Sequence, residues 1–201
     1  WAVVLALHGM NDSRDAWEYP APDFANLGVA VFAPDQRGFG GTKSRGHWAG
    51  TRGLTGDARA MIALLRHRYP HTRLYLMGES MGAAVLMTLA TEPSPPEVDG
   101  YVLIAPAVWG RAKMSLFLRS ALWVASRTVP GIVLTGKGVV KVTASDNREA
   151  LRRLSTDPLT IKGARIDTIK GLVDLMDAAL AAAPRFHAPA IFLYGGHDEL
   201  I

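Results

Sequence analysis

Short, continuous apolar runs recur along the chain and set its expected secondary structure. They cover residues 2–7, 29–34, 74–77, 101–105 and 190–194. Runs of this kind are typical of strands that are buried on both faces of a parallel sheet. Because helix-like segments separate the first four runs, the alternation predicts an α/β protein: a mostly parallel sheet flanked by helices, with right-handed crossovers.

The segments between these runs carry helical spacing. Residues 14–27 are expected to be partly helical, with interruptions at Pro20 and Pro22, and residues 43–53 are polar and irregular. Thr55 is the expected cap of a helix over residues 56–69, and another helix should run from residue 81 to about residue 91. The apolar stripe that should turn the first of these helices toward the sheet consists of Ala58, Met61, Ile62 and Leu65.

The alternation stops after residue 106, and residues 107–187 read as mainly helical. Helical patterns cover residues 114–126 and 169–180, a capping box at residues 146–149 opens a short helix, and only residues 131–134 could form a strand. We therefore expect residues 1–106 and 188–201 to form the core, and residues 107–187 to form a helical cap inserted into it.

Composition narrows the class of protein. The chain has 201 residues, enough to bury a sizeable core in one domain, and 49% of them are hydrophobic. The absence of cysteine excludes disulfides and thiolate metal sites, and no apolar run is long enough to span a membrane. No signal peptide is visible. Because both ends fall at strand-like runs, we expect these residues to be a fragment of a longer chain. For its location we predict only a soluble or peripheral membrane protein.

Positive charge is concentrated in the expected cap. Residues 107–165 hold 11 Lys and Arg but only 3 Asp and Glu, whereas the net charge of the whole chain is +4. A basic region of this kind can attract an anionic membrane or a nucleic acid, but no nucleic-acid motif accompanies it. With the apolar side chains of residues 109–123, it is consistent with contact between the cap and an anionic membrane surface; packing of those side chains onto the core is the alternative.

The strongest chemical signal is the segment from Gly78 through Glu79, Ser80 and Met81 to Gly82. It has the pattern G-x-S-x-G and stands between a strand-like run and a helix-like run, the setting in which the pattern marks a nucleophilic serine. Glycine at both ends would remove side chains that would collide where strand and helix cross. The alternative is a glycine-rich turn that contains a serine by chance.

Two further loops follow strands. The first strand ends in His8-Gly9, which could present a backbone amide beside the serine turn; alternatively it is a plain loop in which Asp12 or Ser13 caps a helix. The second loop, residues 35–42, is rich in glycine but matches neither a dinucleotide nor a P-loop pattern. We expect it to be structural.

Together these features resemble the monoacylglycerol lipase and lysophospholipase group of α/β-hydrolases. The segments that carry the resemblance are residues 7–9, 35–40, 78–82, 157–159 in the cap, and 195–198. The resemblance covers essentially the whole chain. It implies an α/β-hydrolase fold with the cap placed after the strand that follows the serine helix.

The resemblance also implies the roles of individual residues. Ser80 would be the nucleophile and Asp198 the acid of a catalytic triad, with Glu199 as the rival acid. The backbone amides of Met10 and Met81 would form the oxyanion hole. Because the chain order of such enzymes is serine, acid, histidine, and His197 is adjacent to the acid, the catalytic histidine is expected beyond residue 201.

The implied activity is hydrolysis of a lipid ester through an acyl-enzyme, with no cofactor and no metal. The substrate would be a monoacylglycerol or a lysophospholipid, and the oligomeric state is left open. The alternatives are a general carboxylesterase, a peptidase of the same fold, and a catalytically inactive binding protein. A dehalogenase is excluded, because it would need a carboxylate in place of Ser80.

Overall fold

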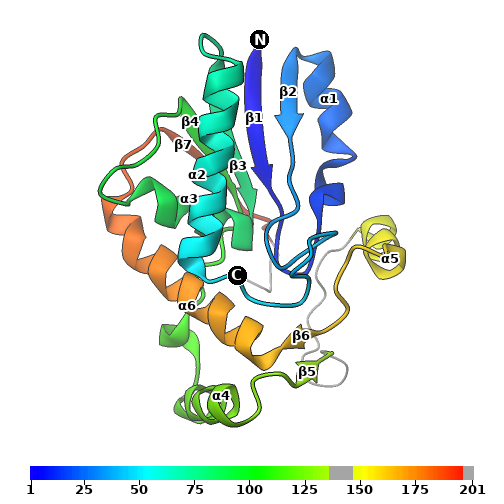
Figure 1. The fold of residues 1–201 in the computed structure, drawn as a ribbon, viewed down its shortest axis with the longest axis vertical. Coiled ribbons are helices and arrows are strands. Elements are labelled where there is room, and N and C mark those ends of the chain that lie inside the picture. The colour runs from blue at the N-terminus through cyan, green and yellow to red at the C-terminus, as the bar shows by residue number, and fades with distance from the viewer. Residues whose placement is uncertain (136–146, 197–201) are drawn as a thin grey trace.

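The computed structural model describes residues 1–135 and 147–196, and a parallel five-stranded sheet lies at its centre (Figure 1). The strand order is β2-β1-β3-β4-β7, and every neighbouring pair is parallel. The strands are β1 (Ala2–Leu7), β2 (Val29–Phe32), β3 (Arg73–Glu79), β4 (Gly100–Ile104) and β7 (Ala190–Leu193). The five predicted strands are therefore confirmed.

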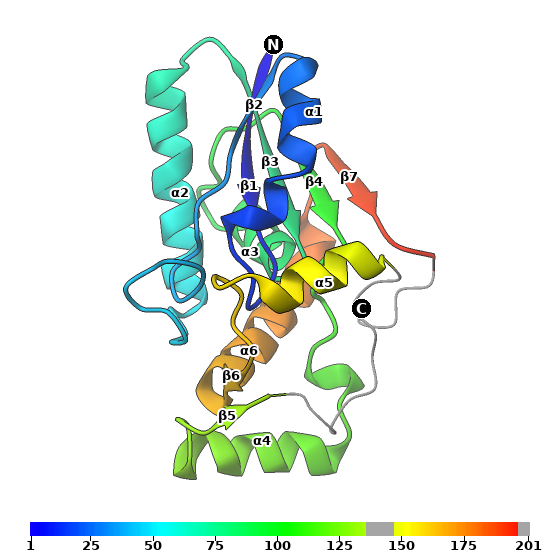
Figure 2. The same ribbon diagram turned by 90° about the vertical axis from the view of Figure 1, so that its right-hand side faces the viewer.

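Helices cover both faces of the sheet, and the central strands β1 and β3 are accordingly mostly apolar. On one face, Leu5 and Leu76 pack among residues of α2 (Thr51–Arg68) and α3 (Met81–Ala90). On the other face, Val4 and Met77 pack against the short helix η1 (Arg14–Trp17) and α1 (Pro20–Asn26). Figure 2 shows α1 and α2 on opposite sides of the sheet. Alternate residues of one strand thus enter two separate clusters of the core.

The start of α2 differs from the sequence prediction. The helix begins at Thr51, after Gly50, instead of after Thr55. Gly50 has φ 79°, a conformation that glycine adopts at little cost, and this allows the helix to start a turn early. Thr55 lies inside the helix, is buried, and donates its hydroxyl to the carbonyl of Arg52. The predicted stripe is otherwise confirmed, since Ala58, Ile62 and Leu65 are buried and Met61 packs against them.

The segment between β4 and β7 is mainly helical, as predicted. It contains η2 (Arg111–Lys113), α4 (Leu116–Thr128), β5 (Val133–Leu134), α5 (Arg148–Thr156), β6 (Ala164–Arg165), α6 (Ile166–Ala182) and η3 (Ala183–Arg185). The possible strand at residues 131–134 is only the two-residue β5, which pairs with β6 apart from the main sheet. Asn147 caps α5 through the amides of the next turn, while Asp146 lies outside the described residues.

This segment lies at the carboxyl ends of the strands, where α6 packs against α3 (Figure 1). Within the described part of the chain, no helix combines the length and the apolar character that a membrane crossing requires.

Candidate active site

Ser80 occupies a sharp turn between the end of β3 and the start of α3. Its backbone has φ 50° and ψ −110°, a conformation that costs a residue other than glycine about 1–3 kcal/mol. The turn is held on both sides, because the Ser80 amide donates to the Ile104 carbonyl at 2.9 Å and the Ser80 carbonyl accepts from the Ala107 amide at 3.1 Å. Strain of this kind is concentrated at functional sites, where the surrounding structure maintains it.

Two glycines make this turn possible. A β-carbon on Gly78 would lie 2.6 Å from the Ala83 nitrogen, and one on Gly82 would lie 2.3 Å from the Leu7 carbonyl oxygen. Real β-carbons essentially never approach backbone atoms so closely. The close approach that the sequence predicted at these two glycines is therefore present, and it places the start of α3 directly against the end of β1.

The end of β1 lies beside the serine. A β-carbon on Gly9 would be only 3.6 Å from the Ser80 β-carbon. The Gly9 carbonyl accepts a hydrogen bond from the His8 ring at 2.7 Å and a longer one from the Asp12 amide at 3.4 Å. Because a trans peptide is planar, these bonds also fix the direction of the Met10 N–H, which points opposite to the Gly9 carbonyl.

Met81 supplies the second expected amide. It is the first residue of α3, where backbone N–H groups have no partner within the helix and the helix dipole favours negative charge. Met81 is fully buried, and the contribution expected from it is its backbone N–H. The structure thus brings Ser80, Met81 and the loop that carries Met10 to one edge of the sheet.

The sequence predicted a role for His8 through its backbone alone. In the structure, its side chain also makes hydrogen bonds that hold this loop. His8 is fully buried; its Nδ1–H donates to Gly9, and its Nε2 accepts from the Gln36 amide at 3.0 Å. Burial lowers the pKa of His8, which favours the neutral ring that this pair of bonds requires. The Gln36 side chain in turn donates to the His8 carbonyl at 2.7 Å.

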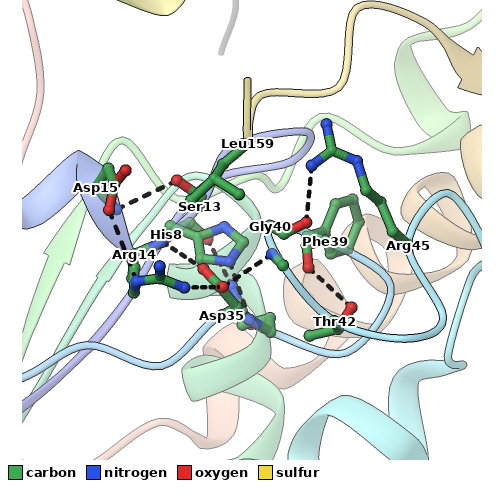
Figure 3. A network of polar contacts seen from close by, with 12 residues as sticks. His8, Ser13, Arg14, Asp15, Asp35, Phe39, Gly40, Thr42, Arg45 and Leu159 are labelled. Carbon is green, nitrogen blue, oxygen red and sulfur yellow. Dashed lines mark hydrogen bonds and ion pairs between the residues drawn. The ribbon is translucent and has the colours of Figure 1, made fainter. Parts of the chain in front are cut away.

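Asp35 joins the loop after β1 to the loop at residues 35–42 (Figure 3). Its carboxylate accepts from the Arg14 amide at 2.8 Å and the Gly41 amide at 2.9 Å, and it forms an ion pair with the Arg14 guanidinium. Burial alone would raise the pKa of Asp35, but the backbone bonds from Arg14 and Gly41, together with the charge of the Arg14 guanidinium, lower it. Ser13 caps η1 by accepting from the Asp15 amide, so the capping alternative for this loop is also realised. The loop at residues 35–42 acts as a support, as predicted.

The pKa values of two carboxyl groups in this part of the molecule, those of Glu79 and Asp12, are raised. Burial raises the pKa of Glu79, and the charge of Asp12 raises it further. Burial likewise raises the pKa of Asp12.

The predicted acid Asp198, its rival Glu199 and His197 lie outside the described residues. The strand that leads to them is β7, which pairs in parallel with β4; the Ala105 amide donates to the Leu193 carbonyl at 2.8 Å. Parallel strands bring their carboxyl ends to the same edge of a sheet, so the described part of β7 leads toward the edge that carries Ser80. The role of Asp198 stays a prediction.

Comparison with known proteins gives a family and a fold. The family described as serine aminopeptidase, S33, matches residues 1–201. The chain is 25% identical to a monoacylglycerol lipase of Mycolicibacterium smegmatis over 99% of this chain and 71% of that protein. It is also 25% identical to the monoglyceride lipase of Rattus norvegicus, again over 99% of this chain but over only 66% of the relative, slightly less than two thirds.

Among solved structures, the monoacylglycerol lipase of Paleococcus ferrophilus matches with a TM-score of 0.77 and 24% identity, over 96% of this chain and 72% of that one. This likeness shows a shared fold. The predicted α/β-hydrolase fold and the predicted resemblance to the monoacylglycerol lipase group are therefore confirmed.

Proposed function

The chain belongs to the serine aminopeptidase S33 family, and from this membership we propose that it is the main part of a serine hydrolase that cleaves lipid esters. The substrates would be monoacylglycerols or lysophospholipids. The observation that carries the proposal is the strained turn at Ser80, which lies between β3 and α3 and against the end of β1. The names of the relatives, monoacylglycerol lipase and monoglyceride lipase, support a lipid ester as substrate.

The proposed mechanism proceeds through an acyl-enzyme. The Ser80 hydroxyl oxygen attacks the ester carbonyl carbon while a histidine beyond residue 201 takes the hydroxyl proton. Asp198 orients that histidine and stabilises its charged form. The N–H groups of Met10 and Met81 donate to the oxyanion, each contributing about 3–4 kcal/mol by analogy with known donors. The histidine then protonates the leaving alcohol, and water, activated by the same histidine, releases the fatty acid.

Turnover by the complete protein tests the proposal. The wild type should hydrolyse a monoacylglycerol and p-nitrophenyl butyrate, and Ser80→Ala should abolish both activities. Ser126→Ala, which changes a serine of α4, is the matched control and should keep them. Because the family description names an aminopeptidase, an aminoacyl p-nitroanilide is assayed in parallel. Turnover of the anilide alone would favour a peptidase, and no turnover of any substrate would favour an inactive binding protein.

A second proposal concerns where the enzyme meets its substrate. The helix α4 has no buried residue, and Leu116, Phe117 and Trp123 are 78%, 79% and 58% exposed. Arg119 and Arg127 belong to the same helix. Exposed apolar side chains interspersed with cationic ones are typical of helices that lie in a lipid interface. We infer that α4 docks on anionic membrane surfaces.

Vesicle binding tests this docking. The complete protein should bind anionic vesicles more tightly than neutral ones, and the preference should weaken as salt screens the charges. Equal binding to neutral and anionic vesicles would contradict the electrostatic part.

A further inference from the structure

One arginine side chain joins two segments that lie far apart in the sequence. We call residues 157–161, between α5 and β6, the strap. Arg45, in the loop between β2 and α2, donates from Nη2 to the strap carbonyls of Pro158 at 2.8 Å and Thr160 at 3.2 Å. From Nη1 it donates to the Gly40 carbonyl at 2.9 Å, a bond visible in Figure 3. The planar guanidinium suits such a bridge, because its donors point in fixed directions.

The strap has internal bonds that hold its shape. The Asp157 carboxylate accepts from the Leu159 amide and the Thr160 hydroxyl, both at 2.8 Å. Burial would raise the pKa of Asp157, but these bonds, together with the charge of Lys162, lower it. Thr160 is buried and Ile161 packs against the main core cluster. Because these bonds keep the strap rigid, a shift of the strap would also shift the residues that it contacts.

The strap contacts the loop that carries the proposed oxyanion donor. The Ile161 amide donates to the Asn11 carbonyl at 2.8 Å, and Asn11 follows Met10 directly. Asn11 itself has φ 65°, a conformation that a residue other than glycine adopts only at a cost. On its other side the loop is bound to Asp35 through the Arg14 amide. The loop from Met10 to Arg14 is thus fixed at both ends.

Arg45 is linked to both of these fixing points. Its Nη2 holds the strap, and its Nη1 holds the carbonyl of Gly40, whose neighbour Gly41 donates to Asp35. We propose that Arg45 is a positioning residue for catalysis: by holding the strap against the core, it keeps the Met10 N–H directed at the oxyanion. This inference rests on the proposed function. It predicts that losing Arg45 slows the chemical step without weakening the binding of a short ester.

The test is the Arg45→Met variant of the complete protein. For p-nitrophenyl butyrate we expect kcat to fall about tenfold to a hundredfold and KM to change less than about twofold, since a misplaced donor costs transition-state binding only. Amide hydrogen exchange at Ile161 should become faster, because its bond to Asn11 loosens. Arg45→Lys, which keeps donors but not their planar arrangement, should restore part of kcat.

Arg66→Met is the matched control. Arg66 also bridges backbone carbonyls, those of Thr72 and Glu97, but at the opposite end of the sheet from Ser80. This variant should keep wild-type kcat and wild-type exchange at Ile161. An equal loss of kcat in both variants would overturn the inference, as would a rise in KM alone for Arg45→Met.

The test separates failure of the inference from failure of the proposed function. If the wild type did not hydrolyse the ester at all, the proposed function would fail, and the positioning role with it. If the wild type were active and Arg45→Met kept both its kcat and its slow exchange at Ile161, only the inference would be overturned.

Discussion

Two helices of the segment after β4, α6 and α4, have similar apolar content but opposite surroundings. In α6, seven of seventeen residues are buried, and Leu175 and Ala179 are fully enclosed where this helix packs against the core. A β-carbon on Gly171 would lie 2.3 Å from the Trp48 ring, which shows how closely α6 approaches the loop between β2 and α2. In α4, by contrast, none of the thirteen residues is buried.

The difference shows that apolar residues have two kinds of surroundings in this segment. Those of α6 bury surface against α3 and so fix the helix over the edge of the sheet that carries Ser80. Those of α4 leave a large apolar area in contact with water, which a protein surface rarely does without an interaction partner. Packing of apolar side chains onto the core, the alternative that the sequence left open, is not seen for Leu116, Phe117 and Trp123, although α4 contacts α6.

The largest effect is expected from shortening a buried side chain of α6. Leu175→Ala should lower the free energy of unfolding by about 2–5 kcal/mol, because it leaves a cavity in the core. Leu118→Ala on α4, where Leu118 is 51% exposed, is the matched control and should change it by less than about 0.5 kcal/mol. Urea unfolding of both variants provides the measurement. Equal losses would contradict the contrast between the two helices.

An intermediate effect is expected from making α4 polar. Replacing Leu116 and Phe117 together by serine should leave the free energy of unfolding nearly unchanged, because both side chains are already exposed. Vesicle binding should weaken at least about tenfold, because each side chain otherwise contributes about 1.5–3 kcal/mol when fully buried in an apolar phase. Vesicle sedimentation measures the binding. Unchanged binding together with unchanged stability would remove α4 as the docking surface.

The smallest effect concerns the charges around Asp174, in the middle of α6. Asp174 accepts from Lys170 and Arg111, and although burial raises its pKa, these bonds outweigh it and lower the pKa from its ordinary value of 3.8. A lowered pKa stabilises the fold above pH 3.8, and this stability is lost as pH falls through the lowered value.

Asp174→Asn should therefore lower the free energy of unfolding at pH 6 by less than about 1 kcal/mol, because the pair is partly exposed. At pH 3 the difference from the wild type should shrink. Urea titrations at the two pH values measure both differences. A larger cost at pH 3 than at pH 6 would reverse the sign of the argument.

The arrangement of strands and the serine turn could be predicted from the sequence for a physical reason. Strands buried on both faces are mostly apolar, and the close packing of α3 on β3 and on the end of β1 leaves room only for glycine at Gly78 and Gly82. Both constraints restrict the residue types of short stretches of chain. They are therefore visible as local patterns, as is the apolar stripe of α2.

Contacts between distant segments could not be predicted in this way. The bonds of Asp35 to the Arg14 amide and of Arg45 to Pro158 join residues that no local pattern connects. The buried ring of His8 gave a signal only as part of the pair His8-Gly9, and its bonds to Gln36 depend on the folded sheet. The early start of α2 was missed because Gly50 was read as part of an irregular loop when it is the position that starts the helix.

The central claim is that Ser80 is a nucleophile, and covalent labelling tests it most directly. The complete protein is treated with a fluorophosphonate, and the modified residue is identified by mass spectrometry of its peptides. We expect a single adduct on Ser80, no adduct in Ser80→Ala, and normal labelling in Ser126→Ala. Labelling that persists in Ser80→Ala, or a wild-type protein that turns over ester without an adduct on Ser80, would contradict the claim.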